Sequence, residues 1–159
     1  MMVQLVPMTE ADFVWYREHL AVAYAQNQVD AGEWEPASAL QQSKDVLDRL
    51  LPDGLATKDH LLFLVMADTP DPVGQLWVSL KRGFDASAFI LDIEIDAPYQ
   101  RRGYGEQTLQ ALEALLKPQG IFKIGLHVHA HNAGARHLYE KMGYGVIGLD
   151  MLKRLDTDE

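Results

Sequence analysis

The chain has 159 residues, 48% of them hydrophobic, and this length and apolar content predict a single domain spanning residues 1–159. The chain has no cysteine, which excludes disulfide frameworks and thiolate sites and favours a cytoplasmic protein. A formal net charge of −9 argues against binding to nucleic acid or an anionic membrane surface, and no apolar run is long enough to span a bilayer.

The first half of the sequence predicts a strand, two helices and a pair of strands. Residues 3–6 form a short apolar strand, and Thr9 then resembles the N-cap of a helix with acidic residues in its first turn. Apolar residues at helical spacing predict a second helix over residues 40–51. Nearly unbroken apolar runs at residues 60–67 and 73–80 predict two buried strands in a hairpin.

Residues 88–95 predict another strand, whose two faces differ in chemistry. Successive side chains of a strand point to opposite faces, so its acidic and apolar residues should be separated. Acidic groups that share one face suggest acid–base chemistry or binding of a cationic group. The alternation places Asp92 and Glu94 on one face and Leu91, Ile93 and Ile95 on the other.

A glycine turn, Gln-Arg-Arg-Gly-Tyr-Gly, follows at residues 100–105 and leads into an apolar helix. Backbone N–H groups at a helix N-terminus can bind a pyrophosphate, and Gly103 and Gly105 would let its oxygens approach the backbone. Arg101 and Arg102 could pair with its charge. The sequence lacks a third glycine of the dinucleotide fingerprint and any P-loop, so the turn is either plain turn chemistry or a different cofactor site.

The last part of the sequence predicts a strand over residues 121–128, a helix over 132–142 and a final strand over 146–155. The strand and helix are joined by a histidine-rich segment. His127, His129 and His131 occupy alternate positions there, and on one strand face they could ligate zinc, copper or iron. A metal-dependent enzyme built on these side chains is therefore one hypothesis.

Two motifs resemble those of the GNAT N-acetyltransferases. Residues 100–105 resemble the family's Gln/Arg-x-x-Gly-x-Gly/Ala signature, and residues 132–144 resemble its Asn-x-x-Ala-x-x-Leu-Tyr-x-x-x-Gly-Phe/Tyr helix. The resemblance implies a mixed α/β (α+β) fold. It has a twisted, mostly antiparallel central sheet, flanked by helices and splayed between the fourth and fifth strands.

The same resemblance implies that acetyl-CoA is the co-substrate and that no metal takes part. The pyrophosphate would bind at the glycine turn, and the strand backbone near residues 93–95 would pair with the pantetheine arm. An asparagine at the start of the later helix would bond that arm, cap its own helix, or do both. The expected cofactor-binding residues are Ile93, Ile95, Gln100, Arg101, Arg102, Gly103, Tyr104, Gly105 and Asn132.

The reaction that the resemblance implies is transfer of an acetyl group to a primary amine by direct attack in a ternary complex. An alkylammonium group has a pKa of about 10.4, so a base must remove its proton, and the departing thiolate needs an acid. Tyr139 is the expected acid. Glu94 and His127 remain alternatives for the base, and Asp92 could instead bind the ammonium group.

The acceptor is expected to be a small-molecule or peptide amine. Asp30, Glu33 and Glu35 weakly favour a cationic acceptor, and aromatic residues such as Trp15 could line its pocket, although most of the aromatic residues should be core. Dimers are common in the family, so a homodimer is one expected assembly. The main alternative of another class is a non-catalytic acyl-CoA-binding or sensing module, which would need the glycine turn but not Tyr139.

Overall fold

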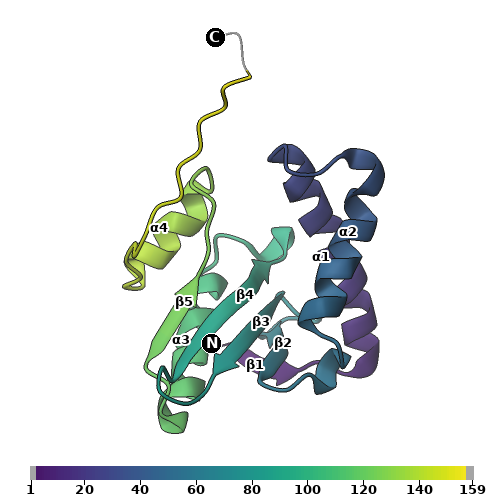
Figure 1. Cartoon of the computed structure of the whole chain (residues 1–159). Coiled ribbons are helices and arrows are strands. Elements are labelled where there is room, and N and C mark those ends of the chain that lie inside the picture. The colour runs from purple at the N-terminus through teal and green to yellow at the C-terminus, as the bar shows by residue number, and fades with distance from the viewer. Residues whose placement is uncertain (1–2, 157–159) are drawn as a thin grey trace. The chain divides into compact units, whose positions relative to one another are not determined.

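The computed structural model describes residues 3–156 and divides into two compact units, which meet in sequence at His127 and Val128. The first unit contains a five-stranded sheet and three α-helices (Figure 1). The second contains one helix and the C-terminal segment. None of the helices between residues 3 and 156 is both long and apolar enough to cross a bilayer.

The sheet is mixed, with its strands in the order β1-β2-β3-β4-β5. The first four are paired antiparallel, and β5 runs parallel to β4. Nearly unbroken apolar runs form β2 and β3, as expected for strands of a sheet that helices cover on both faces. The strands are β1 (Gln4–Pro7), β2 (His60–Met66), β3 (Gly74–Lys81), β4 (Ser87–Ile95) and β5 (Lys123–Leu126).

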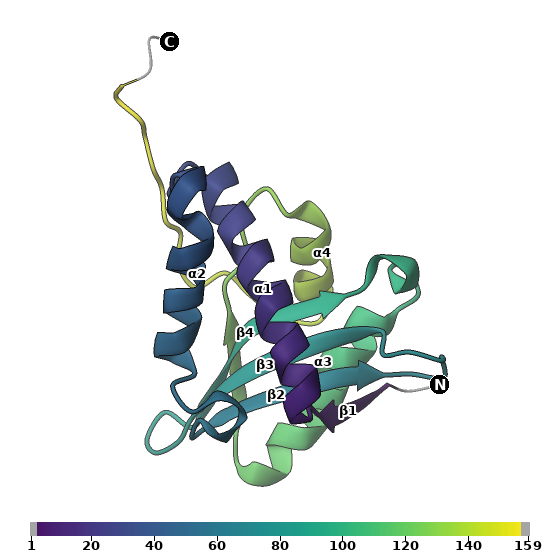
Figure 2. The same ribbon diagram turned by 90° about the vertical axis from the view of Figure 1, so that its right-hand side faces the viewer.

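Helices α1 (Glu10–Asp30) and α2 (Pro36–Leu50) cover one face of the sheet, and α3 (Tyr104–Leu116) covers the other (Figure 2). The predicted N-cap of α1 is confirmed. Thr9 Oγ1 accepts a hydrogen bond from the Asp12 backbone N–H at 3.2 Å, and Asp12 accepts one from the Thr9 N–H at 2.9 Å. This reciprocal pair satisfies donors that the first helical turn leaves open, and so it fixes where α1 begins.

The core on the α1 and α2 side is built around two large aromatic side chains, Tyr16 and Trp77, which are almost fully buried. On the opposite face, α3 buries leucines at helical spacing against the sheet. Burial of this kind is the main favourable contribution to folding. The cluster around Tyr16 and Trp77 also contains Met8, Ala21, Leu47, Leu51 and Leu62.

A β-bulge interrupts the pairing of β3 with β4. Trp77 pairs with Asp92, but the next residue, Val78, pairs with Ile90, so Leu91 is an extra residue in β4. Leu91 packs against the cluster that contains Trp77, on the face that also carries Asp92. The expectation that Leu91 shares a face with Ile93 is therefore wrong, because strict alternation does not hold across a bulge.

The sheet opens between β4 and β5, as the fold expectation required. Their pairing extends from Ser87 and Lys123 to Ile90 and Leu126, where β5 ends. β4 continues to Ile95 beyond this point. The second half of β4 therefore extends past its parallel neighbour, directly before the glycine turn.

In the second unit, α4 (Ala133–Lys141) confirms the last predicted helix. The final strand predicted over residues 146–155 is wrong, because this segment lies in irregular, extended chain. Its large apolar side chains are exposed, including Ile147 and Met151. An apolar pattern alone does not make a strand, because a strand in a sheet also needs a neighbouring strand for its backbone hydrogen bonds.

Candidate active site

Two acidic side chains of β4 share one face, as the strand alternation predicted, and this face meets α1. The Tyr16 hydroxyl donates a hydrogen bond of 2.6 Å to Asp92 Oδ2. Burial raises the pKa of Asp92 to about 6, and the Glu94 charge acts in the same direction, whereas the Tyr16 hydrogen bond and the His19 side chain lower it. Burial likewise raises the pKa of the Tyr16 hydroxyl well above its usual value, and the Asp92 charge adds to this. The Asp92 carboxyl is thus already engaged by a side chain of α1.

Glu94 is paired with a histidine of α1. His19 Nε2 lies 3.1 Å from both carboxylate oxygens of Glu94, and the two side chains are about one-third exposed, at 34% and 35%. The imidazole also stacks on the exposed indole of Trp15, with ring centroids 4.8 Å apart and planes at 11°. The pair therefore joins a strand carboxylate to an imidazole that still reaches water.

The Tyr16–Asp92 and His19–Glu94 contacts follow one another along α1 and β4. Tyr16 and His19 lie three residues apart on one face of the helix, about 4.5 Å along its axis. Asp92 and Glu94 lie two residues apart on one face of the strand, about 6.6 Å along it. His19 could not be identified from the sequence, because nothing in the sequence shows that α1 runs along this part of β4.

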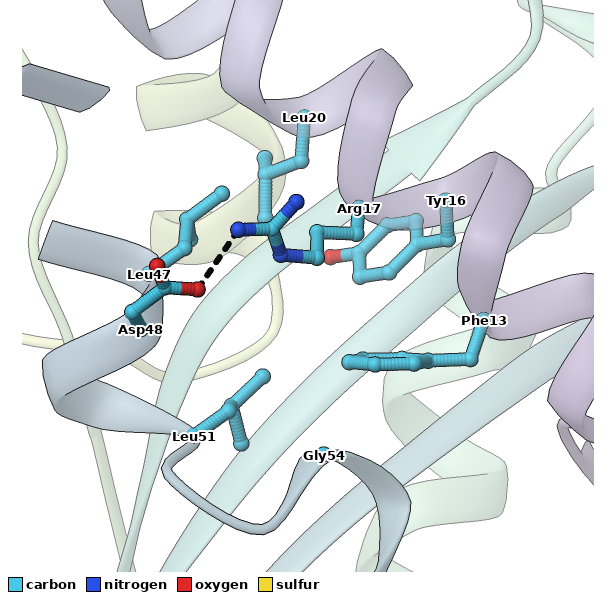
Figure 3. A pocket seen from close by; sticks show the side chains of 8 residues that line it. All are labelled: Phe13, Tyr16, Arg17, Leu20, Leu47, Asp48, Leu51 and Gly54. Atoms are coloured by element: carbon cyan, nitrogen blue, oxygen red, sulfur yellow. Dashed lines mark hydrogen bonds and ion pairs between the residues drawn. The ribbon is translucent and has the colours of Figure 1, made fainter. Parts of the chain in front are cut away.

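A pocket of about 210 Å³ lies beside this cluster, between α1 and α2 (Figure 3). Arg17 and Asp48 form an ion pair of 2.5 Å across it. Tyr16 lines the pocket with its ring and bonds Asp92 through its hydroxyl, so it belongs to both the pocket and the carboxylate cluster. The apolar lining consists of Phe13, Leu20, Leu47 and Leu51.

Asp92 should make the free energy of unfolding fall as the pH rises. Its pKa of about 6 in the folded protein exceeds the ordinary value of about 3.9, so the folded state binds this proton more tightly. The resulting stabilisation is present at low pH and is lost as the pH rises through about 6.

We therefore expect wild-type protein to lose about 1 kcal/mol relative to Asp92→Asn between about pH 5 and pH 7.5. Asparagine can still accept the Tyr16 hydrogen bond through its amide oxygen, so the comparison isolates the titrating proton. Urea unfolding of both proteins at the two pH values measures the difference. The same pH response in both proteins would contradict the assigned role of Asp92.

The glycine turn lies between the end of β4 and the start of α3, after a short 3₁₀ helix at Ala97–Tyr99. The Gln100 side chain donates a hydrogen bond of 2.8 Å to the Ile95 carbonyl, which fixes the turn to the end of the strand. Arg101 has φ of 64°, a conformation that is uncommon for a residue with a side chain. The left-handed backbone conformation of Arg101 therefore turns the chain away from the direction of β4.

Gly103 is the N-cap of α3 and has φ of 84°. A Cβ atom on this residue would have no neighbour closer than Gln107 Nε2 at 3.9 Å, so the surface above the first turn of α3 is open. Arg102 is exposed and lies over the Tyr99 ring at 5.9 Å from its centroid. Backbone donors at a helix N-terminus beside two exposed arginines fit an anionic phosphate group.

The motif residues of the second unit form a short capped helix. Asn132 Oδ1 accepts a hydrogen bond of 3.2 Å from the Ala135 N–H, which confirms its capping role. Tyr139 is half-buried in α4, and its ring meets the edge of the Tyr144 ring with centroids 5.8 Å apart. Within this unit Tyr139 is therefore held by aromatic packing.

The three histidines do not form the arrangement that the metal hypothesis needs. β5 ends at Leu126, so His127, His129 and His131 lie beyond the strand rather than on one of its faces. His129 and His131 stack with ring centroids 5.4 Å apart. Among residues 3–156, no group of three or more His, Asp or Glu side chains is placed to hold a metal ion.

Comparison with known proteins identifies the family. Residues 15–144 match the Acetyltransferase (GNAT) family. The chain belongs to the GNAT family of acetyltransferases. This match includes most of α1 and both motifs, so the resemblance drawn from the two motifs is confirmed. GNAT enzymes use acetyl-CoA as acetyl donor, and the open anion-binding surface at Gly103 agrees with this.

Named relatives within the GNAT family include the uncharacterized N-acetyltransferase YycN of Bacillus subtilis (strain 168). It is 38% identical over 156 residues, which are 98% of this chain and 100% of YycN. The crystal structure of YycN, a putative acetyltransferase, has a TM-score of 0.91 and covers 96% of this chain and 98% of its own. This chain and YycN therefore share their fold and sequence similarity over nearly their whole lengths.

Two further proteins resemble this chain less extensively. A segment of 57 residues is 39% identical to the ribosomal protein bS18-alanine N-acetyltransferase of Salmonella typhimurium (strain LT2), covering 36% of this chain and 38% of that enzyme. AAC(6′)-Iy, in complex with the bisubstrate analogue CoA-S-monomethyl-acetylneamine, has a TM-score of 0.60 at 13% identity and covers 97% of this chain and 98% of its own. The second comparison shows a shared fold.

Proposed function

We propose that this protein transfers the acetyl group of acetyl-CoA to a primary amine by direct attack in a ternary complex. The observation that carries the proposal is the Glu94–His19 pair, which lies on the part of β4 that extends past β5. A carboxylate paired with an imidazole and open to solvent is suited to accept a proton from an ammonium group. The glycine turn that follows this strand is suited to hold the donor.

Acetyl-CoA would be held by two parts of the first unit. The N-terminal N–H groups of α3, with Arg101 and Arg102, would bind the pyrophosphate. The backbone of β4 at Ile93 and Ile95 would pair with the pantetheine arm like an added strand. When bound there, acetyl-CoA supplies a thioester carbonyl that an amine can attack.

Glu94 is the better of the two candidates for the base. It is only one residue from the end of β4, and it points to the α1 side with 35% of its side chain exposed. His127 lies just past the end of β5, where its position is not set by strand pairing. Asp92 is bonded by Tyr16 and is less available to an ammonium group, so we assign it a supporting role beside Glu94.

Tyr139 is the proposed acid that protonates the departing CoA thiolate. Its support is the match of residues 132–144 to the family helix, and phenol has a pKa near that of an alkyl thiol, about 10 against about 8.5. In the proposed reaction the C–N bond forms, the C–S bond breaks, and the thiolate takes a proton from the phenol.

An amine panel tests this function. Purified protein is given acetyl-CoA and a series of primary amines, including polyamines, amino acids, aminoglycosides and a peptide with N-terminal alanine, and CoA release is measured. Tyr139→Phe should lower turnover about 10²-fold while acetyl-CoA still binds. The matched control is Tyr24→Phe, which removes the hydroxyl of an α1 tyrosine whose ring packs against Trp34.

The outcomes separate the proposed enzyme from a binding module. Turnover with at least one amine, reduced in Tyr139→Phe and unchanged in Tyr24→Phe, supports acetyl transfer with Tyr139 as acid. Acetyl-CoA binding without CoA release for any amine would contradict the enzyme and favour an acyl-CoA sensor. Full turnover in Tyr139→Phe would contradict the role of Tyr139 alone.

A further inference from the structure

We propose that His19 accepts the substrate proton from Glu94 and releases it to water. This inference rests on the proposed acetyl transfer and adds a residue that neither motif contains. His19 acts through Glu94, so it is a positioning and proton-transfer residue rather than one that touches the reacting atoms.

The proton balance requires an exit. An amine that enters as an ammonium group carries three protons on nitrogen, and the amide product keeps one. As the C–N bond forms and the C–S bond breaks, the leaving thiolate takes the Tyr139 proton, and one of the two protons lost by nitrogen restores the phenol. The other proton is taken by Glu94 and has to leave the site before the next turnover, because a protonated carboxyl cannot act as a base.

The geometry gives this proton a direct path. His19 Nε2 lies 3.1 Å from each oxygen of Glu94, within hydrogen-bond distance, so a proton can pass from either oxygen to the imidazole. Imidazole is the side chain that ordinarily gains and loses a proton near neutral pH, and 34% of the His19 side chain is exposed to water. Stacking on Trp15 keeps the ring oriented toward Glu94.

The surrounding charges leave His19 as the partner of Glu94. On α1, Arg17 and Glu18 contact each other and are also engaged by α2, through Asp48 and Lys44 respectively. On β4, the Asp92 carboxyl is bonded by the Tyr16 hydroxyl and interacts with both Glu94 and His19. The Tyr16 hydroxyl is itself buried and committed to Asp92, so it is no route to water.

Two substitutions of His19 separate proton transfer from packing. His19→Gln can still donate a hydrogen bond to Glu94 but cannot carry a proton, whereas His19→Ala leaves a space that free imidazole can enter. We expect both variants to lower kcat about 10-fold or more, with the KM for acetyl-CoA unchanged. Free imidazole should restore kcat in His19→Ala and not in His19→Gln.

The control is His60→Gln. His60 accepts a hydrogen bond of 2.9 Å from Trp77 Nε1, which glutamine can also accept. It lies away from Glu94, because it pairs with Ser79 near one end of β3, whereas Glu94 pairs with Gln75 near the other end. Its kcat should equal that of wild type and should not respond to imidazole. Thermal unfolding of all variants shows that each is folded at the assay temperature.

Each outcome decides the proposal. Imidazole-dependent recovery in His19→Ala alone supports proton transfer through His19. Wild-type kcat in His19→Gln, or a loss in His19→Ala that imidazole does not restore, overturns it while acetyl transfer by wild type still stands. Absence of CoA release by wild type across the amine panel overturns acetyl transfer itself and the His19 role with it, and this result is read from the wild-type protein alone.

Discussion

Replacing Gly74 with alanine should destabilise the protein by about 3 kcal/mol or more, the upper part of the range for overpacked interiors. Gly74 is buried at the start of β3, where it pairs with Ile95 of β4. A methyl group at this position would overlap the backbone carbonyl oxygen of Glu94. Neither strand can yield through a side-chain rotation, since the obstacle is backbone, so β4 would have to move away from β3.

The matched control is Gly125→Ala in β5. There the added methyl would lie 3.3 Å from the Phe89 ring, and Phe89 is 42% exposed and can rotate away. We expect a change of less than about 1 kcal/mol, as for surface substitutions. Urea unfolding measures both variants. Near-wild-type stability in Gly74→Ala would contradict a close approach of the β3 and β4 backbones at Gly74 and Glu94.

Glu94→Gln should lower kcat about 10³-fold, within the range for loss of general base catalysis. Glutamine has nearly the shape of glutamate and can still bond His19 through its amide, so packing of α1 on β4 should be preserved. What is lost is the carboxylate that takes the proton from the ammonium group. Steady-state CoA release with the preferred amine of the panel measures kcat, and acetyl-CoA affinity should stay unchanged.

Glu18→Gln is the charge-matched control for this experiment. Glu18 precedes His19 on α1, and its side chain is 55% exposed and paired with Arg17 and Lys44. It removes one carboxylate near the same histidine without touching the proposed base, and kcat should stay within about twofold of wild type. Equal kcat in Glu94→Gln and wild type would reject Glu94 as the base and return His127 to consideration.

The helices and buried strands were predictable because their signals are local. The Thr9–Asp12 capping box, the apolar runs of β2 and β3, and the leucines of α3 each depend on residues close together in the sequence. The strand over residues 146–155 was predicted by the same apolar pattern and is wrong. A strand in a sheet needs a partner strand elsewhere in the chain. The apolar pattern of one segment does not show whether such a partner pairs with it.

Some parts of the candidate site were likewise predictable from local sequence, and others were not. The glycine turn was recognisable from its sequence because both its conformation and its exposed backbone donors follow from glycines and the helix that begins there. The bulge at Leu91 was not, because it is a property of the register between β3 and β4. His19 was also missed, since its partner Glu94 lies 75 residues further along the chain.

The sequence by itself determined the family, the turn from Gln100 to Gly105 and the acidic face of β4. Each of these follows from motif spacing or strand alternation, which depend only on residues close together in the sequence. Only the tertiary structure decided which side chains complete that face. Packing of α1 along β4 commits Asp92 to Tyr16 and leaves Glu94 with an imidazole that reaches water. Such a pairing depends on where a helix crosses a strand, and that position is set by the packing of the whole core.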